Sequence, residues 1–517
     1  MTGNSIVSQP DVSITIVPAQ QKVDNTAHRV LVVGQLISGT AVSGDLQSNI
    51  GNSNEEDALF GKQSMIAGMI RAYKKINEVS PIDAIGLDDP AGVAANGTVT
   101  FTGDPSVDGS LTVIIASAAN HTLTISVVDA DTATTIGDKL VVAVDADLTI
   151  PVSAANAAGV VTITALNVGL EGNDITLKST GTVTGVTVAI AAMASGTLSP
   201  ALTTVFDVVA ELRYQTVIWP FSYGLDDLTG FLDPRFNVTN DIQDGIGITT
   251  STDTFANLGT AGNLENSQSL VIIGFNVVAD TLFAGSSMLE QGVNVSSELA
   301  AIRALRLTED ASIGQFVIAT AGARDTFGGP ALASFPYFNT PFPSLPLIPT
   351  GKGFDRSEIE ALATAGVVTI GNNKAGNETI AGEVVTTYKT DSAGNPDVSF
   401  KYANFVDTSV NVREYMFNNV KSRFAQSRLT EGDVVEGRAM ANEAIIRGFL
   451  GSLYDDLTGP DFVLTQAGED AQNFFNDNLV ITIDLADGKV TADMKVPLVT
   501  QFRTFIATLQ IAFSTEA

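Results

Sequence analysis

The sequence of 517 residues contains no cysteine, two histidines and a single tryptophan. The absence of cysteine excludes disulfide bonds, thiolate metal sites and cysteine nucleophiles. Any chemistry that needs two histidines would have to use both His28 and His121, and we interpret these as surface or strand-edge residues. The HExxH and GxSxG motifs of metalloproteases and serine hydrolases do not occur. We therefore expect no enzymatic activity, no metal and no cofactor.

Basic side chains are also scarce: 27 Lys and Arg stand against 57 Asp and Glu, for a formal net charge of −30. Such a charge repels phosphate groups and anionic lipid, so neither nucleic acid nor a membrane surface is an expected partner. Long apolar runs are missing too, because Leu270–Phe275 and Ile114–Ala119 are far shorter than the roughly 20 residues of a membrane helix. The N-terminus lacks the basic and apolar regions of a secretion signal, which predicts a chain that begins in the cytoplasm.

Residues 93–200 differ in composition from the rest of the chain. They carry two basic side chains, nine acidic ones and a single aromatic residue, Phe101. Short β-branched runs separated by Gly, Asp and Asn predict an inserted all-β domain, a sandwich or barrel packed mainly with Val, Ile, Leu and Ala. The runs are Thr98–Thr102, Leu111–Ile115, Leu123–Val128, Val160–Thr164, Ile175–Lys178 and Val183–Ile190.

The flanking segments have the pattern of a mixed α/β fold. Ser53–Lys75 opens with polar residues and then places apolar residues at the i, i+3, i+4, i+7 spacing of one helical face, which predicts a helix. His28–Gly34 and Tyr214–Pro220 predict buried strands of a sheet covered on both faces. A proline-rich connector over 330–349 precedes Asp355–Ala365, which predicts a short helix.

Strict alternation of apolar residues marks three segments near the chain ends. Over 479–496 it predicts a hairpin that turns at Asp487-Gly488, because this dipeptide supplies the positive φ of a tight turn. The two outermost segments predict strands with no partner nearby in the sequence. Their apolar members are Val12, Ile14 and Ile16 at one end and Phe505, Leu509, Ile511 and Phe513 at the other.

One local charge stands out against the acidic chain. Ser409–Leu429 contains four basic residues and one acid, Glu414, a local balance of +3. If the segment is helical, Arg413, Lys421 and Arg428 fall within an arc of roughly 80°; the fourth basic residue is Arg423. Two interpretations are open: an ordinary amphipathic helix with a solvated basic rim, or a helix that docks on an acidic protein surface.

Other matches to ligand-binding motifs are incomplete. Gly61-Lys62-Gln63 lacks the Ser or Thr and the first Gly of a phosphate-binding loop, and the match that opens at Gly245 ends in Thr250 where a third Gly is needed. Asp129-Ala130-Asp131 and Asp145-Ala146-Asp147 lack the Gly and Glu of a calcium loop. We interpret these aspartates as turn residues.

Several longer motifs occur in an order that resembles a known family. They are FGKQSMIAGMIRAYKK (60–75), DDPAG (88–92), GLEGND (169–174), TPFPSLPLIP (340–349) and VTTYKTDSAGNPDVSFK (385–401). With them the chain resembles the contractile tail sheath proteins of Mu-like myophages. The resemblance covers most of the chain; it is most specific in TTYKTDSAGNPD and least specific in 93–200.

This resemblance implies a role in assembly. Sheath proteins polymerise as stacked rings around a tail tube and contract to drive the tube through the host envelope, so the implied partners are neighbouring sheath subunits, the tube, baseplate and tail terminator proteins. The implied location is the virion tail, assembled in the host cytoplasm. Val12–Val17 and Phe505–Phe513 would be arms exchanged with neighbouring subunits, which add strands beside the 479–496 hairpin. Arg413, Lys421, Arg423 and Arg428 would face the tube.

The expected fold is a multidomain α+β and α/β protein: a sheath core with the subtilisin-like fold described for the family, an inserted all-β domain and extended terminal arms. The expected divisions are an arm over 1–25, a core over 26–92 and 201–354, the insert over 93–200, a C-terminal sheath domain over 355–500 and an arm over 501–517. A β-rich adhesin or surface-layer protein, and a hydrolase, are the alternatives.

Overall fold

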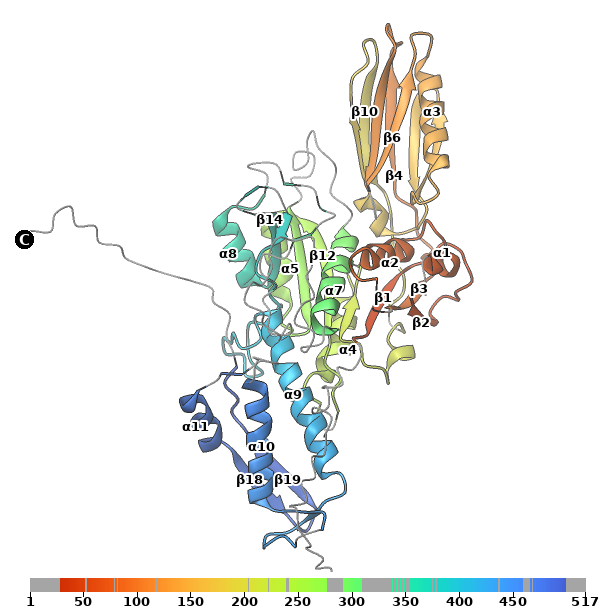
Figure 1. The fold of residues 1–517 in the computed structure, drawn as a ribbon. Coiled ribbons are helices and arrows are strands. Elements are labelled where there is room, and N and C mark those ends of the chain that lie inside the picture. The colour runs from red at the N-terminus through yellow and green to blue at the C-terminus, as the bar shows by residue number, and fades with distance from the viewer. Residues whose placement is uncertain are drawn as a thin grey trace, which may run out of the picture.

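The computed structural model shows an elongated molecule with three parts, in which a central sheet lies between the inserted domain and the C-terminal domain (Figure 1). It describes residues 28–498 apart from 52–53, 79, 81, 117–119, 203, 222, 239–240, 277–291, 309–336, 338–340, 343–344, 346, 349–352, 374, 377–378, 436–437, 459–464 and 467. Both predicted arms, 1–25 and 501–517, lie outside the described residues. Within the described part, no helix combines the length and apolar character that crossing a bilayer requires.

The central sheet has eight strands in the order β15-β14-β13-β12-β11-β1-β3-β2. The strands from β14 to β3 run parallel, and the edge strands β2 and β15 pair antiparallel. Their near-continuous apolar runs fit a parallel sheet buried on both faces. The bounds are β1 (Val30–Gln35), β2 (Leu46–Ile50), β3 (Ile82–Leu87), β11 (Thr216–Ile218), β12 (Ile246–Asp253), β13 (Leu270–Asn276), β14 (Val367–Asn372) and β15 (Thr379–Ala381). β1 and β11 confirm the two strands predicted from the sequence.

Helices cover both faces of this sheet. On one face lie α2 (Met65–Ile76), which packs on Gly34 of β1, and α7 (Gly292–Thr308), which reaches Thr216 of β11. On the other lie α4 (Leu225–Leu232), α5 (Phe255–Leu264) and α8 (Arg356–Ala365). α8 confirms the helix predicted there, and Asp355 and Glu358 form its capping box. Two short 3₁₀ turns, η2 (Asp207–Val209) and η3 (Asp233–Arg235), lie in the connections.

The helix predicted over Ser53–Lys75 is confirmed in its apolar part, which is α2 with Ile66, Met69, Ile70 and Tyr73 buried. It is wrong as a single helix, because a separate helix precedes α2. α1 (Glu55–Phe60) ends at Gly61, whose φ is +86°, and α2 begins after Ser64. A Cβ at Gly61 would lie 2.6 Å from Oγ of Ser38, so a distant loop requires glycine at this turn. Ser64 Oγ then caps α2 by accepting from the backbone N–H of Ala67.

The inserted segment has its own hydrophobic core between two antiparallel sheets, β10-β4-β8-β7 and β6-β5-β9. The prediction of an all-β domain is wrong in one respect, since helix α3 (Ala133–Ala146) also packs on this core with Ile136, Leu140 and Val144. The strands are β4 (Asn96–Thr102), β5 (Gly109–Ala116), β6 (Asn120–Val127), β7 (Val152–Ala157), β8 (Val160–Ala165), β9 (Thr176–Thr180) and β10 (Thr187–Ala194), and η1 (Leu170–Asp174) lies between β8 and β9.

The C-terminal part has a third core and includes the predicted hairpin. β18 (Val480–Asp484) pairs with β19 (Lys489–Asp493), with Ile483 opposite Val490, which confirms the prediction. Around it lie α9 (Ala403–Phe424), α10 (Glu443–Thr458) and α11 (Glu469–Asp477), and a short pair of strands, β16 (Arg428–Leu429) and β17 (Met440–Ala441).

Candidate functional site

The long helix α9 belongs to two hydrophobic cores. Ala403 and Val406, in its first turns, pack in the core of the central sheet, whereas Val412 and Met416 pack in the C-terminal core. Figure 1 shows the helix running from the sheet into the C-terminal domain. The side chains where α9 crosses the sheet edge therefore determine how these two parts are joined. We call this place the α9 junction.

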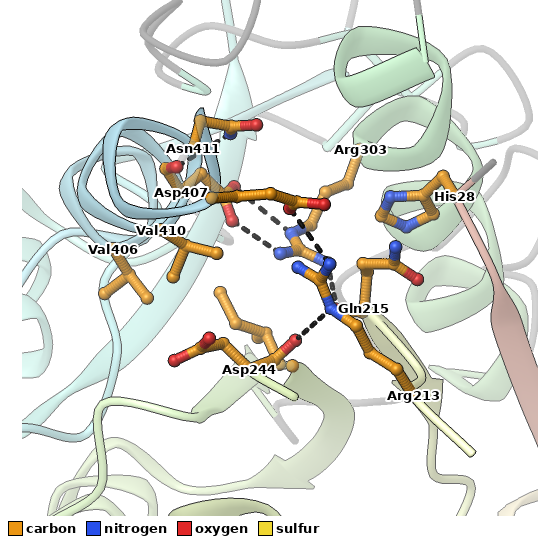
Figure 2. Close-up of a pocket in the computed structure, with 12 residues that line it drawn as sticks. His28, Arg213, Gln215, Asp244, Arg303, Val406, Asp407, Val410 and Asn411 are labelled. Carbon is orange, nitrogen blue, oxygen red and sulfur yellow. Dashed lines mark hydrogen bonds and ion pairs between the residues drawn. The ribbon is translucent and has the colours of Figure 1, made fainter. Parts of the chain in front are cut away.

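A buried ion pair lies at the centre of the α9 junction (Figure 2). Arg303 of α7, 5% exposed, donates from Nε and Nη2 to the two carboxylate oxygens of Asp407, at 3.2 and 2.5 Å. Tyr337 donates to Asp407 Oδ2 at 2.6 Å, and Arg303 Nη1 donates to the Gln215 carbonyl oxygen and to Thr216 Oγ1. Burial opposes the charge on Arg303, but the pKa of Arg303 is raised because the adjacent Asp407 carboxylate outweighs that cost.

Two more ion pairs join α9 to the loops before β11 and β12. Arg213 Nη1 lies 2.9 Å from Glu414 Oε2, and Arg413 Nη1 lies 2.6 Å from Asp244 Oδ2. Arg413 also donates to the carbonyl oxygens of Val238 and Asp241. All these contacts lie at the amino-terminal edge of the parallel strands, so α9 is fixed to the sheet along one edge.

A small polar cavity of about 30 Å³ lies between these groups, lined by His28, Arg213, Arg303 and Asp407 among others. That volume holds about one water molecule. His28 Nε2 is 2.9 Å from Thr216 Oγ1. Burial and the nearby charges of Arg303 and Arg213 hold the pKa of His28 well below its usual range, so the ring is neutral. This arrangement supports structure, and the cavity has no room for a substrate.

The structure separates the four basic residues that were predicted to face the tube, Arg413, Lys421, Arg423 and Arg428. Arg413 is engaged within the chain by Asp244, and Arg428 lies in β16, beyond the end of α9 at Phe424, so the two do not share a helical arc. Lys421 and Arg423, in the last turn of α9, and Arg428 are exposed. The three exposed residues Lys421, Arg423 and Arg428 are called the basic tip below.

Both histidines are buried, His28 at 4% and His121 at 7% exposure, so the surface half of their interpretation is wrong. The strand-edge half holds for His121, which lies in the edge strand β6. His121 Nδ1 lies 2.6 Å from Asp147 Oδ2. Asp147 Oδ1 also accepts from the Thr149 backbone N–H, and Asp131 accepts from the backbone N–H of Val128. Asp129 lies in a turn, and Asp131 and Asp147 accept backbone bonds next to turns, as predicted. The prediction is wrong for Asp145, which lies in helix α3. Across the described residues, no group of three or more His, Asp or Glu side chains is placed to hold a metal ion.

Sequence reasoning missed the partners at the α9 junction because they are far apart in the chain. Arg303 and Asp407 are 104 positions apart, and Arg213 and Glu414 are 201 apart. The one local signal is a lone charge within an apolar helical stretch, as at Arg303 in LAAIRAL. Such a charge is found buried only when a partner neutralises it.

Taken together, the fold and the α9 junction define a multidomain α/β protein in which three parts are joined by polar contacts. Comparison with known proteins then indicates which class of structural protein it resembles. The Mu-like prophage FluMu tail sheath protein of Haemophilus influenzae is 25% identical to this chain over 497 residues, which cover 93% of this chain and 92% of that protein. The predicted resemblance to the tail sheath proteins of Mu-like phages is thereby confirmed. No family model matches the chain.

Solved structures give weaker similarities. The sheath tail protein of Desulfitobacterium hafniense has a TM-score of 0.44 at 13% identity, with 94% of this chain and 98% of that chain covered. The sheath tail protein of Listeria innocua has a TM-score of 0.45 at 11% identity, covering 92% of both chains. The contracted helical sheath of the anti-feeding prophage has a TM-score of 0.47 at 10% identity, covering 98% and 99%.

Replacing Asp407 with Asn tests the central ion pair. The Asp407→Asn variant leaves the buried charge of Arg303 without its counterion, and we expect a loss of about 3–5 kcal/mol in the free energy of unfolding, measured by urea denaturation. The matched control is Glu360→Gln, which breaks the Arg356–Glu360 pair whose side chains are 93% and 67% exposed; its loss is expected below about 0.5 kcal/mol. Equal losses in the two variants would contradict the assignment.

The neutral state of His28 predicts acid sensitivity. Below about pH 6.5 an unfolded histidine binds a proton that the folded chain, with its lowered pKa, does not bind, so stability falls as the pH decreases. In His28→Gln the slope of unfolding free energy against pH, between pH 6.5 and 5, should be smaller by up to about 1.4 kcal/mol per pH unit. Urea unfolding at several pH values measures this slope. Near pH 7.5, the reference, the unfolding free energies of the two proteins should depend on pH in the same way. Parallel curves below pH 6.5 as well would refute the prediction.

Proposed function

We propose that this chain is the structural subunit of a contractile tail sheath, which polymerises as stacked rings around a tail tube and contracts to drive the tube through the host envelope. The observation that carries this proposal is the similarity to a tail sheath protein along nearly the whole of both chains. We infer a structural and not a catalytic role, because the relative that carries the proposal is a tail sheath protein. Its partners are neighbouring copies, the tube, the baseplate and the tail terminator, and its place is the virion tail, assembled in the host cytoplasm.

The hairpin β18–β19 is the proposed receptor for exchanged arms. A two-stranded hairpin is marginally stable alone, and in the described residues neither strand pairs with a third. Ile481 and Ile483 face the C-terminal core, whereas Val480 is 56% exposed. The alternating apolar residues of Val12–Val17 and Phe505–Phe513 suit strand addition at such edges, where backbone hydrogen bonds give affinity and side chains give register. A head-to-tail exchange of this kind closes into rings or continues as a helix.

The molecule has two distinct ends that fit a radial arrangement. Figure 1 places the inserted domain and the carboxyl end of α9 at opposite ends of the elongated molecule. The basic tip lies at the α9 end, where it contributes positive charge to a chain of formal net charge −30. We assign this end to the tube and the inserted domain to the outside of the sheath. Charge complementarity at the tube would set orientation and register more than affinity.

The α9 junction suits transmission of force during contraction. Separating a buried Arg–carboxylate pair costs several kcal/mol, so a push on the C-terminal domain passes through α9 to the central sheet. Contraction then rearranges the contacts between copies, while the arms act as tethers that keep neighbouring subunits connected. Energy stored in a metastable extended lattice drives the change, without nucleotide.

Electron microscopy of the purified chain, with its tail tube protein, tests the proposal. We expect stacked rings or tubes from the full chain. A chain lacking Phe505–Ala517 should stay folded, with an unchanged circular dichroism spectrum, but should not polymerise because the exchanged strand is gone. Monodisperse full-length chain with no polymer on the tube would reject the sheath function, and polymers of normal length from the truncated chain would reject only the arm assignment.

Charge reversal tests the tube-facing end. In Lys421→Glu, Arg423→Glu, Arg428→Glu the chain should fold normally, but its co-sedimentation with the tube should decrease at least about tenfold because the tip would repel an acidic surface. The matched control reverses three exposed basic residues of the core, Lys62, Lys75 and Arg356, with the same change in net charge. An equal yield from the two variants would favour the solvated-rim interpretation.

A further inference from the structure

The topology of the central sheet creates a crevice at its carboxyl edge. From β1 the chain moves to β3 on one side, and it then returns to β11 on the other side and continues outward through β12, β13 and β14. The direction therefore reverses between β1 and β11. In open α/β sheets the crevice beyond the carboxyl ends of the strands at such a point is the usual ligand site.

In this protein the base of the inserted domain occupies that crevice. Gln35, the last residue of β1, donates from Nε2 to the Val168 carbonyl oxygen at 2.7 Å and to Asp89 Oδ1 at 2.8 Å. Asn167 donates from Nδ2 to the Leu36 carbonyl oxygen and to Asp89 Oδ1, both at 3.0 Å. The backbone N–H of Val168 donates to Asp89 Oδ2 at 3.0 Å. These directional bonds seat the inserted domain on the core at a defined angle.

A carboxyl group with a raised pKa lies at this contact between the inserted domain and the core. Glu171 of η1 is 8% exposed, and Ser199 Oγ donates to its Oε1 at 3.3 Å. Burial raises the pKa of Glu171 to about 7; the hydrogen bond from Ser199 opposes the increase, and the charges of Asp174 and Asp89 add to it.

The other titratable groups around Glu171 come from four parts of the chain. Arg71 of α2 lines the same cavity, but its guanidinium is paired with Asp57. Tyr223, in the loop after β11, has a pKa raised by burial and by the Glu171 charge, so it stays protonated across the physiological range. Asp174 belongs to the same turn as Glu171, and Asp89 precedes the inserted domain. Burial raises the pKa of Asp174 to about 6, so Asp174 also ionises within the range in which Glu171 titrates. Near neutral pH an ionised Glu171 therefore faces two carboxylates, Asp174 and Asp89.

We propose that the inserted domain is held in this crevice by a proton-dependent clamp, tight while Glu171 carries a proton and looser once Glu171 is ionised. Ionised Glu171 faces Asp89 and Asp174 in a buried place, and it gains hydration when the base of the domain moves away. A released Glu171 would have its ordinary pKa of about 4.5, against about 7 when seated. Seating is therefore strongest below about pH 4.5, weakens as the pH rises to about 7, and changes little above that.

The chain carries a natural probe at this place. Trp219 is the single tryptophan of the sequence, and its Nε1 donates to the Tyr223 carbonyl oxygen at 3.1 Å. Tyr223 in turn donates from its hydroxyl to the Pro200 carbonyl oxygen at 3.3 Å, where the chain leaves the inserted domain. A movement of the base of the domain should therefore change the fluorescence of Trp219.

The test follows the intact chain between pH 5 and 8 by Trp219 fluorescence and by hydrogen exchange of residues 165–175. After correction for the intrinsic rate, the exchange rate in the unaltered chain should increase by tens of fold from pH 5 to pH 8. A factor of this size follows from the difference between the pKa of Glu171 when seated, about 7, and when released, about 4.5. Glu171→Gln, which imitates the protonated acid, should show a much smaller increase, limited to the contribution of Asp174, whose pKa burial raises to about 6. Asp145→Asn, at an exposed acid of the same domain, is the control and should behave as the unaltered chain.

An equal dependence on pH in the unaltered chain and in Glu171→Gln would overturn the proposal. Should Glu171→Gln fail to fold, the fluorescence titration of the unaltered chain decides alone: a transition with a midpoint near pH 7 supports the clamp, and its absence between pH 5 and 8 rejects it. Neither outcome depends on sheath assembly, because the measurement uses the unassembled chain.

Discussion

The pairing of Asp407 with Arg303 is the contact on which the arrangement of the central sheet and the C-terminal domain depends. Both charges are buried, and each is compensated by the other and by surrounding hydrogen bonds. Since α9 contributes to two hydrophobic cores, fixing its first turns to the sheet also fixes the position of the second core. A buried pair of this kind adds little net stability compared with apolar residues, but it tolerates only one geometry. We infer that it is retained for the orientation it imposes.

The two joints of the molecule differ in their physics. The α9 junction uses Arg–carboxylate pairs, and arginine as a residue type carries a permanent charge in proteins. The joint to the inserted domain uses neutral amide donors and carboxylates, with Glu171 near its own titration range. A subunit that bears load on one side and presents a separate domain on the other would need this difference, because only the load-bearing side has to be insensitive to its surroundings.

Elements with a strong local pattern could be predicted from the sequence. The hairpin at 480–493 and helix α8 have period-two alternation, a turn dipeptide or a capping box, each of which acts within a few residues. The break at Gly61 has local signals, the positive φ of Gly61 and the cap Ser64, that the apolar spacing of 66–73 concealed. The partner of Arg413 could not be predicted, because Asp244 is 169 positions away. Helix α3 was missed because its β-branched residues resemble the strands around it. The predicted arms lie outside the described residues, and their role stays a prediction.

The inserted domain leaves and rejoins the core at one place. Val93 and Thr197 form an antiparallel bridge, so the two connecting segments run side by side, with Cα atoms about 5 Å apart. A domain attached through such neighbouring ends can be exchanged for another whose own termini lie equally close, while the register of the central sheet is left intact. Recombination at this bridge would replace the inserted domain and leave the central sheet and the C-terminal domain unchanged.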